Sequence, residues 1–192
     1  MNPLNSIRNL FKKKSQELTE EDNKFNEAFN EYQEGKKLYS AKKYQDAIYY
    51  FDRAIESGFE RYYNEIYELR AISLQTLQFD LDAIEDFNKA ISLAPEDANL
   101  FFMRGLSRGA TGDFIGSIFD YKEAIRLSKI DNNLNDHWNN YAKETGWTSV
   151  SAVYEHHLVR AQMNKDLYEK HPDAWERRME KHPLHRRNES ST

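Results

Sequence analysis

The sequence predicts an all-α protein whose central part is a row of stacked helical hairpins, extended by further helices at the C-terminus. Two observations predict this class. The 192 residues contain only seven glycines and four prolines, so long stretches run without a helix breaker. In addition, a nine-residue segment occurs three times with the same arrangement of small, aromatic and alanine positions, beginning at Ala47, Ala83 and Ser117. The copies are 36 and then 34 residues apart, as expected for hairpins that stack on their neighbours.

Each copy carries the residues that allow two helices to pack closely. A small residue begins the segment and another lies twelve positions before it, so two helices can cross where their side chains are short. An aromatic residue follows four positions later on the same helical face, next to the neighbouring hairpin. An alanine then leaves room for that neighbour. In chain order these positions are Gly35, Ala47, Phe51 and Ala54; Ala71, Ala83, Phe87 and Ala90; and Gly105, Ser117, Tyr121 and Ala124.

These copies resemble the tetratricopeptide repeat (TPR) family, and the resemblance covers roughly 105 of the 192 residues. Pro95 stands at the family's helix-ending proline, and Phe101 takes the place of the family's tryptophan at the start of the third unit. The first unit is two residues longer than the second, and the turn Gly58-Phe59-Glu60 accommodates the insertion. The resemblance implies an α-solenoid of three TPR-like hairpins that forms a short right-handed superhelix and binds another protein as a scaffold or adaptor.

The pattern also divides the chain. Helices are expected near residues 24–40, 44–57, 62–77, 80–93, 97–110 and 114–128, followed by helices at about 149–170 and 173–181. The expected parts are a basic and then acidic, partly mobile N-terminal extension at 1–23, three repeats at about 24–60, 61–96 and 97–129, a C-terminal helical extension at 130–182, and a mobile tail at 183–192. The extension that begins near His137 is interpreted as a capping helix for the third hairpin, with a degenerate fourth repeat as the alternative.

In the TPR family, ligands bind in a concave groove lined by the first helix of each hairpin. The matching positions here are aromatic, aliphatic, polar and acidic: Phe29, Tyr32, Lys36, Tyr39, Glu65, Glu68, Ile72, Gln75, Asn99, Phe102 and Leu106. Such a lining suits an amphipathic segment of a protein or peptide partner, neutral to basic in charge. One TPR subfamily grips acidic chaperone C-termini with Lys, Asn and Arg. Only Lys36 is cationic at those positions, and Glu65 and Glu68 would repel a carboxylate, so an acidic chaperone tail is not the expected partner.

The apolar groove positions have a second interpretation. The chain's own C-terminal helix carries an apolar stripe that includes Val150, Tyr154 and Leu158, and this stripe is able to fill the groove in place of a partner. If that helix is displaceable, the protein is autoinhibited and both interpretations hold. The sequence leaves these alternatives open, together with the oligomeric state.

Composition argues against several function classes. The chain has no cysteine, which excludes disulfides, thiolate metal sites and a cysteine nucleophile. Motifs for nucleotide binding, zinc peptidases and serine hydrolases do not occur, so we expect no catalytic residue, no cofactor, no metal and no enzyme activity. The net charge is −5, and the stretch from Glu60 to Ser128 holds 7 basic against 12 acidic residues, which disfavours nucleic-acid binding. No apolar run reaches the ~18 residues that span a bilayer, and a cytoplasmic protein is expected.

Two alternatives to a cytoplasmic scaffold depend on the ends of the chain. Leu4, Ile7 and Leu10 can share one helical face next to four basic residues, which would make residues 1–14 a weak membrane-binding segment of a peripheral adaptor. All six histidines follow the third hairpin, and the spacing of His182 and His185 is compatible with a metal site in a small metal-dependent activity. Because prolines interrupt this segment, solvent-exposed histidines without a metal are the expectation.

Overall fold

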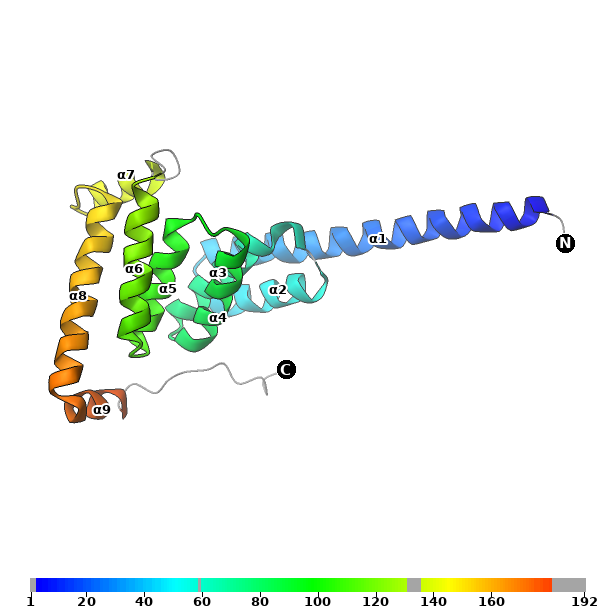
Figure 1. Cartoon of the computed structure of the whole chain (residues 1–192). Helices are drawn as coiled ribbons and strands as arrows, with labels where there is room; N and C mark the ends of the chain where they lie inside the picture. The colour runs from blue at the N-terminus through cyan, green and yellow to red at the C-terminus, as the bar shows by residue number, and fades with distance from the viewer. Residues whose placement is uncertain (1–2, 59, 131–135, 181–192) are drawn as a thin grey trace.

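The computed structural model describes residues 3–58, 60–130 and 136–180, and within these ranges the regular structure is entirely helical. The elements are α1 (Pro3–Ser40), α2 (Tyr44–Glu56), the 3-10 turn η1 (Glu60–Tyr62), α3 (Tyr63–Thr76), α4 (Asp80–Leu93), α5 (Ala98–Ala110), α6 (Phe114–Ser128), α7 (Asp136–Glu144), α8 (Val150–Lys170) and α9 (Pro172–Glu180). Hairpins α1–α2, α3–α4 and α5–α6 stack in chain order into an elongated row, with α8 at its far end (Figure 1).

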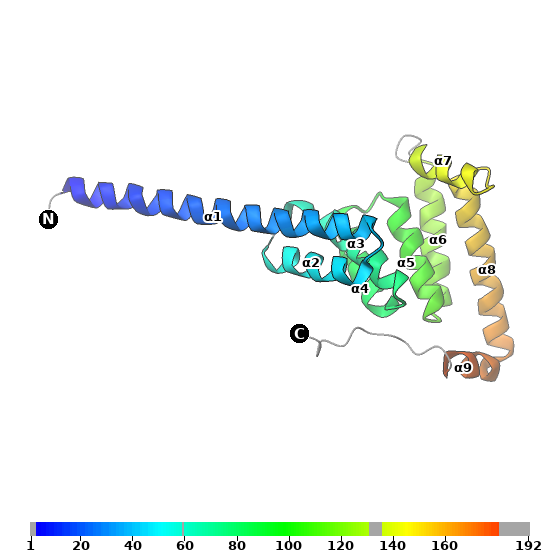
Figure 2. The ribbon, with the colours of Figure 1, turned by 180° about the vertical axis from the view of Figure 1, so that it is seen from behind.

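The first helix is longer than the repeat pattern predicts. It begins at Pro3 instead of near residue 24, so the N-terminal extension is helical and continuous with the first hairpin. Its N-terminal half projects away from the other helices in both views (Figures 1 and 2). The physical reason is the absence of a breaker: after Pro3, which is tolerated in the first turn of a helix, no proline occurs in α1 and its first glycine is Gly35.

The turns inside the three hairpins have one shared geometry. Lys42, Gln78 and Gly112 lie 36 and then 34 residues apart, and they adopt positive φ angles of 60°, 66° and 87°. The amide of the next residue then donates to the carbonyl five positions back, as in the bonds from Lys43 to Leu38 and from Asp113 to Arg108, both 2.9 Å. This is the left-handed helix ending that usually carries glycine, and only the third hairpin has the glycine.

The small positions of the repeat create room for the aromatic ring of the same hairpin. A Cβ atom added to Gly35 would lie 2.7 Å from the Phe51 ring, and one added to Gly105 would lie 2.7 Å from the Tyr121 ring. In the third hairpin, Ser117 Oγ also donates a 2.8 Å hydrogen bond to the Gly105 carbonyl, so the predicted facing of these two residues is confirmed. Phe51 is fully buried and Tyr121 is almost fully buried, so these contacts lie in the core of the first and third hairpins.

Buried ion pairs connect successive hairpins. Arg70 on α3 donates to both oxygens of Asp86 on α4, at 2.6 and 2.7 Å, and to Asp52 on α2 at 2.5 Å. The arrangement recurs 34 residues later, where Arg104 on α5 donates to both oxygens of Asp120 and to Asn88 on α4. Charged residues at these positions were not predicted to be buried, because lysine, arginine and acidic residues are normally exposed unless they are paired. Each arginine therefore links its own hairpin to the preceding one.

The end of the array is covered by α8. This helix packs on α6 as α3 packs on α2 and α5 packs on α4, and Val150 and Tyr154 bury themselves against Ala124 and Leu127. The cap is thus α8 and not the segment beginning near His137, which forms the short helix α7 and contacts α8. The reason is length and register: the nine residues of α7 are too few to span the third hairpin, whereas α8 has 21 residues with inward-facing apolar positions.

Candidate partner-binding groove

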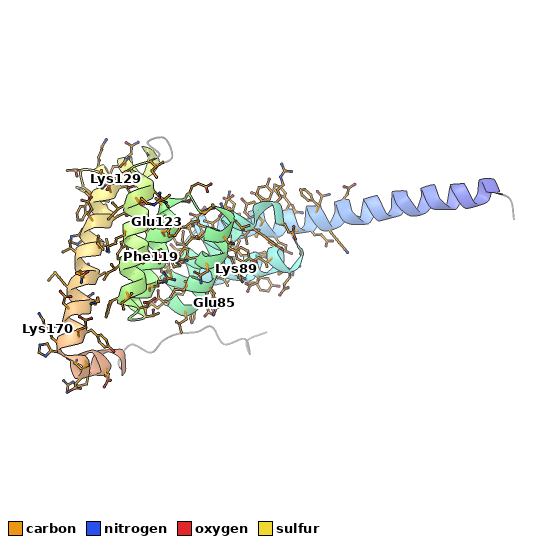
Figure 3. The ribbon with its side chains drawn as sticks, in the orientation of Figure 1. Glu85, Lys89, Phe119, Glu123, Lys129 and Lys170 are labelled. Atoms are coloured by element: carbon orange, nitrogen blue, oxygen red, sulfur yellow. The ribbon has the colours of Figure 1, made fainter. Side chains whose placement is uncertain are left out.

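The eleven predicted groove residues lie on α1, α3 and α5, the first helices of the three hairpins. The second helices carry the opposite, outer surface, where Glu85 and Lys89 on α4 and Phe119 and Glu123 on α6 extend outward (Figure 3). Nine of the eleven predicted groove side chains are partly exposed, and two are buried. The buried ones are Tyr32, 1% exposed, and Asn99, 5% exposed, which therefore support the groove from below and offer little surface to a ligand.

Between the first two hairpins, the groove contains a closed polar network. The Tyr32 hydroxyl donates to Glu65, and Lys36 Nζ lies 2.6 Å from the other oxygen of that carboxylate and 3.2 Å from the hydroxyl. Burial, followed by the bond to Glu65, raises the pKa of Tyr32 to about 12, and the Glu65 carboxylate raises the pKa of Lys36. Lys36 and Glu65 are each 39% exposed but largely satisfy each other, so the one cationic groove residue is already neutralised.

A second acidic group lies one turn further along α3. Burial, assisted by the charges of Asp97 and Glu65, raises the pKa of Glu68 to about 7, while a hydrogen bond from the Asn99 side chain opposes the shift. Asp97 caps the N-terminus of α5 by accepting a 2.9 Å bond from the Asn99 amide, and burial raises its pKa too. Within the described ranges, neither Glu68 nor Asp97 has a lysine or arginine at ion-pair distance. The middle of the groove is therefore an acidic strip without an internal counter-charge.

The remaining predicted residues of the first two hairpins form the walls. Phe29 packs on Tyr32 and on Tyr62, with ring centroids 6.3 and 6.2 Å apart, and Tyr39 packs edge-on against Tyr44. Ile72 is partly buried and packs against the core cluster that helices α2 to α5 share. Gln75 donates to the Met103 carbonyl at 2.9 Å and to Ser107 Oγ at 2.7 Å, so its amide ties α3 to α5 and is not free for a ligand.

At the third hairpin, α8 covers the groove residues. The ring of Phe102 lies 4.6 Å from that of Tyr154 and 5.2 Å from that of His157. Leu106 lines a hollow of about 240 Å³ together with His157 and Arg160. A second hollow, also of about 240 Å³, opens between α5, α7 and α8 beside Phe102 and Asn99. Helix α8 therefore packs over Phe102 at the third hairpin, and the other predicted groove residues lie on α1, α3 and α5.

Sequence reasoning named Val150, Tyr154 and Leu158 on this C-terminal helix, but it missed Asp97, His157 and Arg160. Asp97 immediately precedes α5 and accepts the capping bond at its N-terminus, so the pattern Asp97-Ala98-Asn99 contained a recognisable helix-start signal. His157 and Arg160 had no such signal, because they follow the last repeat. Burial, then the charges of His156 and Arg160, lowers the pKa of His157.

The described residues show no site for either of the two alternative functions, membrane binding by residues 1–14 or metal binding by the histidine-containing C-terminal segment. His182 and His185 lie outside the described residues, and the described part of the chain contains no cluster of three or more histidine or acidic residues suited to a metal ion. Residues 3–14 form the start of α1, while their side chains lie outside the described set. Among the described residues, no helix is both long enough and apolar enough to cross a membrane.

Stacked hairpins with a groove on their first helices define the TPR class of helical solenoid, and comparison with solved structures confirms this fold. No known family profile and no curated protein matches the sequence. The Sgt2 TPR domain from Aspergillus fumigatus is 17% identical with a TM-score of 0.54, covering 75% of this chain and 82% of that domain. Yeast Tom70 is 19% identical with a TM-score of 0.56, covering 77% of this chain and 26% of Tom70. The first TPR domain of Spaghetti (RPAP3), bound to the HSP90 peptide SRMEEVD, is 19% identical with a TM-score of 0.50, covering 62% of this chain and 94% of that domain.

Proposed function

We propose that this protein is a non-enzymatic interaction scaffold whose groove binds a basic, amphipathic segment of a partner protein. The observation that carries the proposal is the acidic strip of Glu68 and Asp97, which lies beside aromatic and aliphatic walls and lacks an internal counter-charge. A lysine or arginine of the partner supplies that charge, and its apolar neighbours pack on Phe29 and Ile72. The TPR fold supports the general role, since the solved relatives include a TPR domain bound to a peptide.

The same charges disfavour an acidic peptide such as the one bound to RPAP3. Lys36 is held by Glu65 at 2.6 Å, so a carboxylate ligand has to compete for it. Leu69 and Met103, at two further positions where the carboxylate-binding subfamily places polar or basic residues, contribute to the apolar clusters of the array. An incoming carboxylate would also meet Glu68 and Asp97 without a cation to offset the repulsion.

Autoinhibition by the C-terminal helix is not needed for this function. Tyr154 is 1% exposed and Val150 is 5% exposed, so removing α8 would expose the core of the third hairpin. We therefore assign α8 as a permanent cap that shortens the groove, and the acidic strip remains available without displacing it. The proposed ligand lies across α1, α3 and the start of α5.

Site-specific photo-cross-linking in the native cell tests the proposal. A photoreactive benzoylphenylalanine replaces Phe29 in the groove or, as a matched control, Phe119, which is 61% exposed on the outer side of α6 (Figure 3). We expect a specific protein to be cross-linked at Phe29 through a peptide containing lysine or arginine, and not at Phe119. The cross-link should weaken in the variant Glu68→Gln/Asp97→Asn, which removes both charges but keeps the shape and the α5 cap. Identical products at both positions, or a strictly acidic peptide at Phe29, would sink the idea.

A further inference from the structure

The outer face of the capping helix α8 carries an apolar ridge among its polar residues, although a cap should be polar there. Val159, Met163 and Leu167 are 58%, 65% and 55% exposed, and their four-residue spacing places them on one ridge of the helix. A terminal element of a repeat array needs a polar outer surface for solubility. Both views show α8 as the outermost helix at its end of the array (Figures 1 and 2). This ridge therefore requires an explanation.

The position of α8 in the array explains why the ridge is uncovered. The first helix of the second hairpin, α3, is covered by α4, and α5 is covered by α6. Helix α8 occupies the place of the next first helix, on α6, but among the described residues only the short helices α7 and α9 contact it besides the third hairpin. Within the described part of the chain, the face of α8 that the second helix of a hairpin would cover is thus left uncovered.

We propose that a second copy of this chain covers the ridge, and that two α8 helices pair antiparallel about a two-fold axis at Met163. In such a pairing Met163 meets its own counterpart, and Val159 packs beside Leu167 of the second copy. The same contact is made twice, as a symmetric dimer requires. A ridge with one central and two equidistant apolar residues is self-complementary in this arrangement.

The charges at the two ends of the ridge select the antiparallel copy. Glu155 lies eight residues before Met163 and Lys170 lies seven residues after it, so the pairing places Glu155 level with Lys170 of the second copy, twice. Lys170 is the last residue of α8 and lies at the end of the helix that adjoins α9 (Figure 3). A parallel pairing would instead place like charges opposite each other. Among the described residues of one chain, Glu155 has an exposed 3.9 Å contact with Lys129 and accepts a long, exposed 3.5 Å hydrogen bond from Ser151, and both are weak competitors.

The proposed dimer leaves binding unobstructed. Tyr154 and His157 face the third hairpin, whereas Val159, Met163 and Leu167 face solvent, so the contact with the second copy is on the side of α8 away from α5. Two grooves are then presented by one particle. The inference is independent of the groove's ligand: the dimer can exist whether or not the acidic strip binds a basic segment.

Sedimentation equilibrium of the full chain, at up to about 100 µM because the equilibrium depends on concentration, tests the dimer. We expect a dimer for the wild type and a monomer for Met163→Glu. Because Met163 is 65% exposed in the single chain, this substitution should leave the fold of the monomer intact. Glu155→Lys and Lys170→Glu should each weaken the dimer roughly tenfold, and the double variant Glu155→Lys/Lys170→Glu should restore it. A monomeric wild type, or a dimer that persists unchanged in Met163→Glu, would overturn the proposal.

A cysteine cross-link locates the contact. The chain has no cysteine, so Met163→Cys introduces a single thiol on the proposed axis, where mild oxidation should give a disulfide-linked dimer. Phe119→Cys is the matched control, since Phe119 is similarly exposed but lies on α6. Equal cross-linking of the two variants would contradict an α8 contact, and circular dichroism verifies that both are folded.

Discussion

The buried arginine that joins the first two hairpins provides the sharpest test of how the array is held together. Arg70 is 11% exposed and Asp86 is 3% exposed, so replacing Arg70 with methionine leaves a buried carboxylate without its two guanidinium bonds. Breaking a buried pair from one side costs about 3–5 kcal/mol. Asp86 still has Lys89 at 3.8 Å, and Asp52 is partly exposed to water. Both facts reduce the cost of removing Arg70, so we expect the lower end of this range, about 3 kcal/mol.

For a chain of this size, that loss corresponds to a decrease in Tm of roughly 6–12 °C. Thermal and urea unfolding followed by circular dichroism measures it. The double variant Arg70→Met/Asp86→Leu should lie within about 1 kcal/mol of the wild type, because an apolar pair of similar volume replaces a buried ion pair at little cost. Arg126, whose pairing with Glu123 is on the surface, is the control, and Arg126→Met should leave the Tm unchanged. The reasoning fails if the double variant is no more stable than Arg70→Met alone.

The third hairpin contains an internal comparison for the same reasoning. Arg104 holds Asp120 as Arg70 holds Asp86, but Asp120 also accepts a 2.9 Å bond from Arg108. Asp120 is fully buried and keeps a hydrogen-bonded guanidinium when Arg104 is removed, whereas Asp86 keeps only Lys89 at 3.8 Å when Arg70 is removed. Arg104→Met should therefore decrease stability less than Arg70→Met, and the opposite order would show that a direct hydrogen bond to the remaining charged partner does not decide the cost.

The remaining predictions concern other parts of the array. Because the pKa of Glu68 is raised from about 4.5 to about 7, the folded state binds more protons than the unfolded state between these values, so this group's effect is to lower stability as pH rises through that window. Glu68→Gln should remove this effect, making the variant more stable than the wild type at pH 8 by roughly 3 kcal/mol but not at pH 4, as measured by urea unfolding. Gly105→Ala drives a methyl group into the Tyr121 ring and should cost about 1–3 kcal/mol, whereas Gly109→Ala, whose nearest contact would be 3.3 Å, should be close to neutral; equal losses would argue against the packing described. In flotation with anionic vesicles, the full chain and a variant lacking residues 1–14 should both stay unbound, and flotation of the full chain alone would favour peripheral membrane binding.

The fold was largely predictable because the repeat positions are physically constrained. Helices α2 to α6 begin and end within one residue of their predicted limits, since the small, aromatic and alanine positions fix both the crossing of two helices and the period. The start of α1 at Pro3 was not predictable from the repeat, because the repeat pattern begins near residue 24 and does not constrain the structure of the residues before it. The cap was assigned to the segment beginning near His137 because Trp138 and Ala142 repeat part of the family pattern, while the apolar stripe of α8, with Val150 and Tyr154, was interpreted as a groove filler instead.

The sequence predicted where the groove residues lie on the helices, but it did not predict how exposed their side chains are. Placing a residue on the first helix of a hairpin follows from the period, whereas its exposure depends on neighbours far along the chain. Tyr32 is buried because the ring of Tyr62, which follows the two-residue insertion, stacks on it at 4.9 Å. Phe102 is covered because Tyr154 and His157 approach it from outside the repeats. The acidic groove residues Glu65 and Glu68 were visible in the sequence, whereas the contribution of Asp97 and the burial that raises the pKa of Glu68 required the packed structure.

The central claim is that the groove recognises basic amphipathic segments, and peptide-library selection on the purified protein tests it without a known partner. The wild type should enrich peptides with lysine or arginine beside apolar residues spaced three or four apart, and Glu68→Gln/Asp97→Asn should lose this preference for basic residues. Glu85→Gln, on the outer side of α4, is the matched control and should select the same peptides as the wild type (Figure 3). Enrichment of acidic peptides by the wild type, or identical peptide sets from all three proteins, would contradict the account.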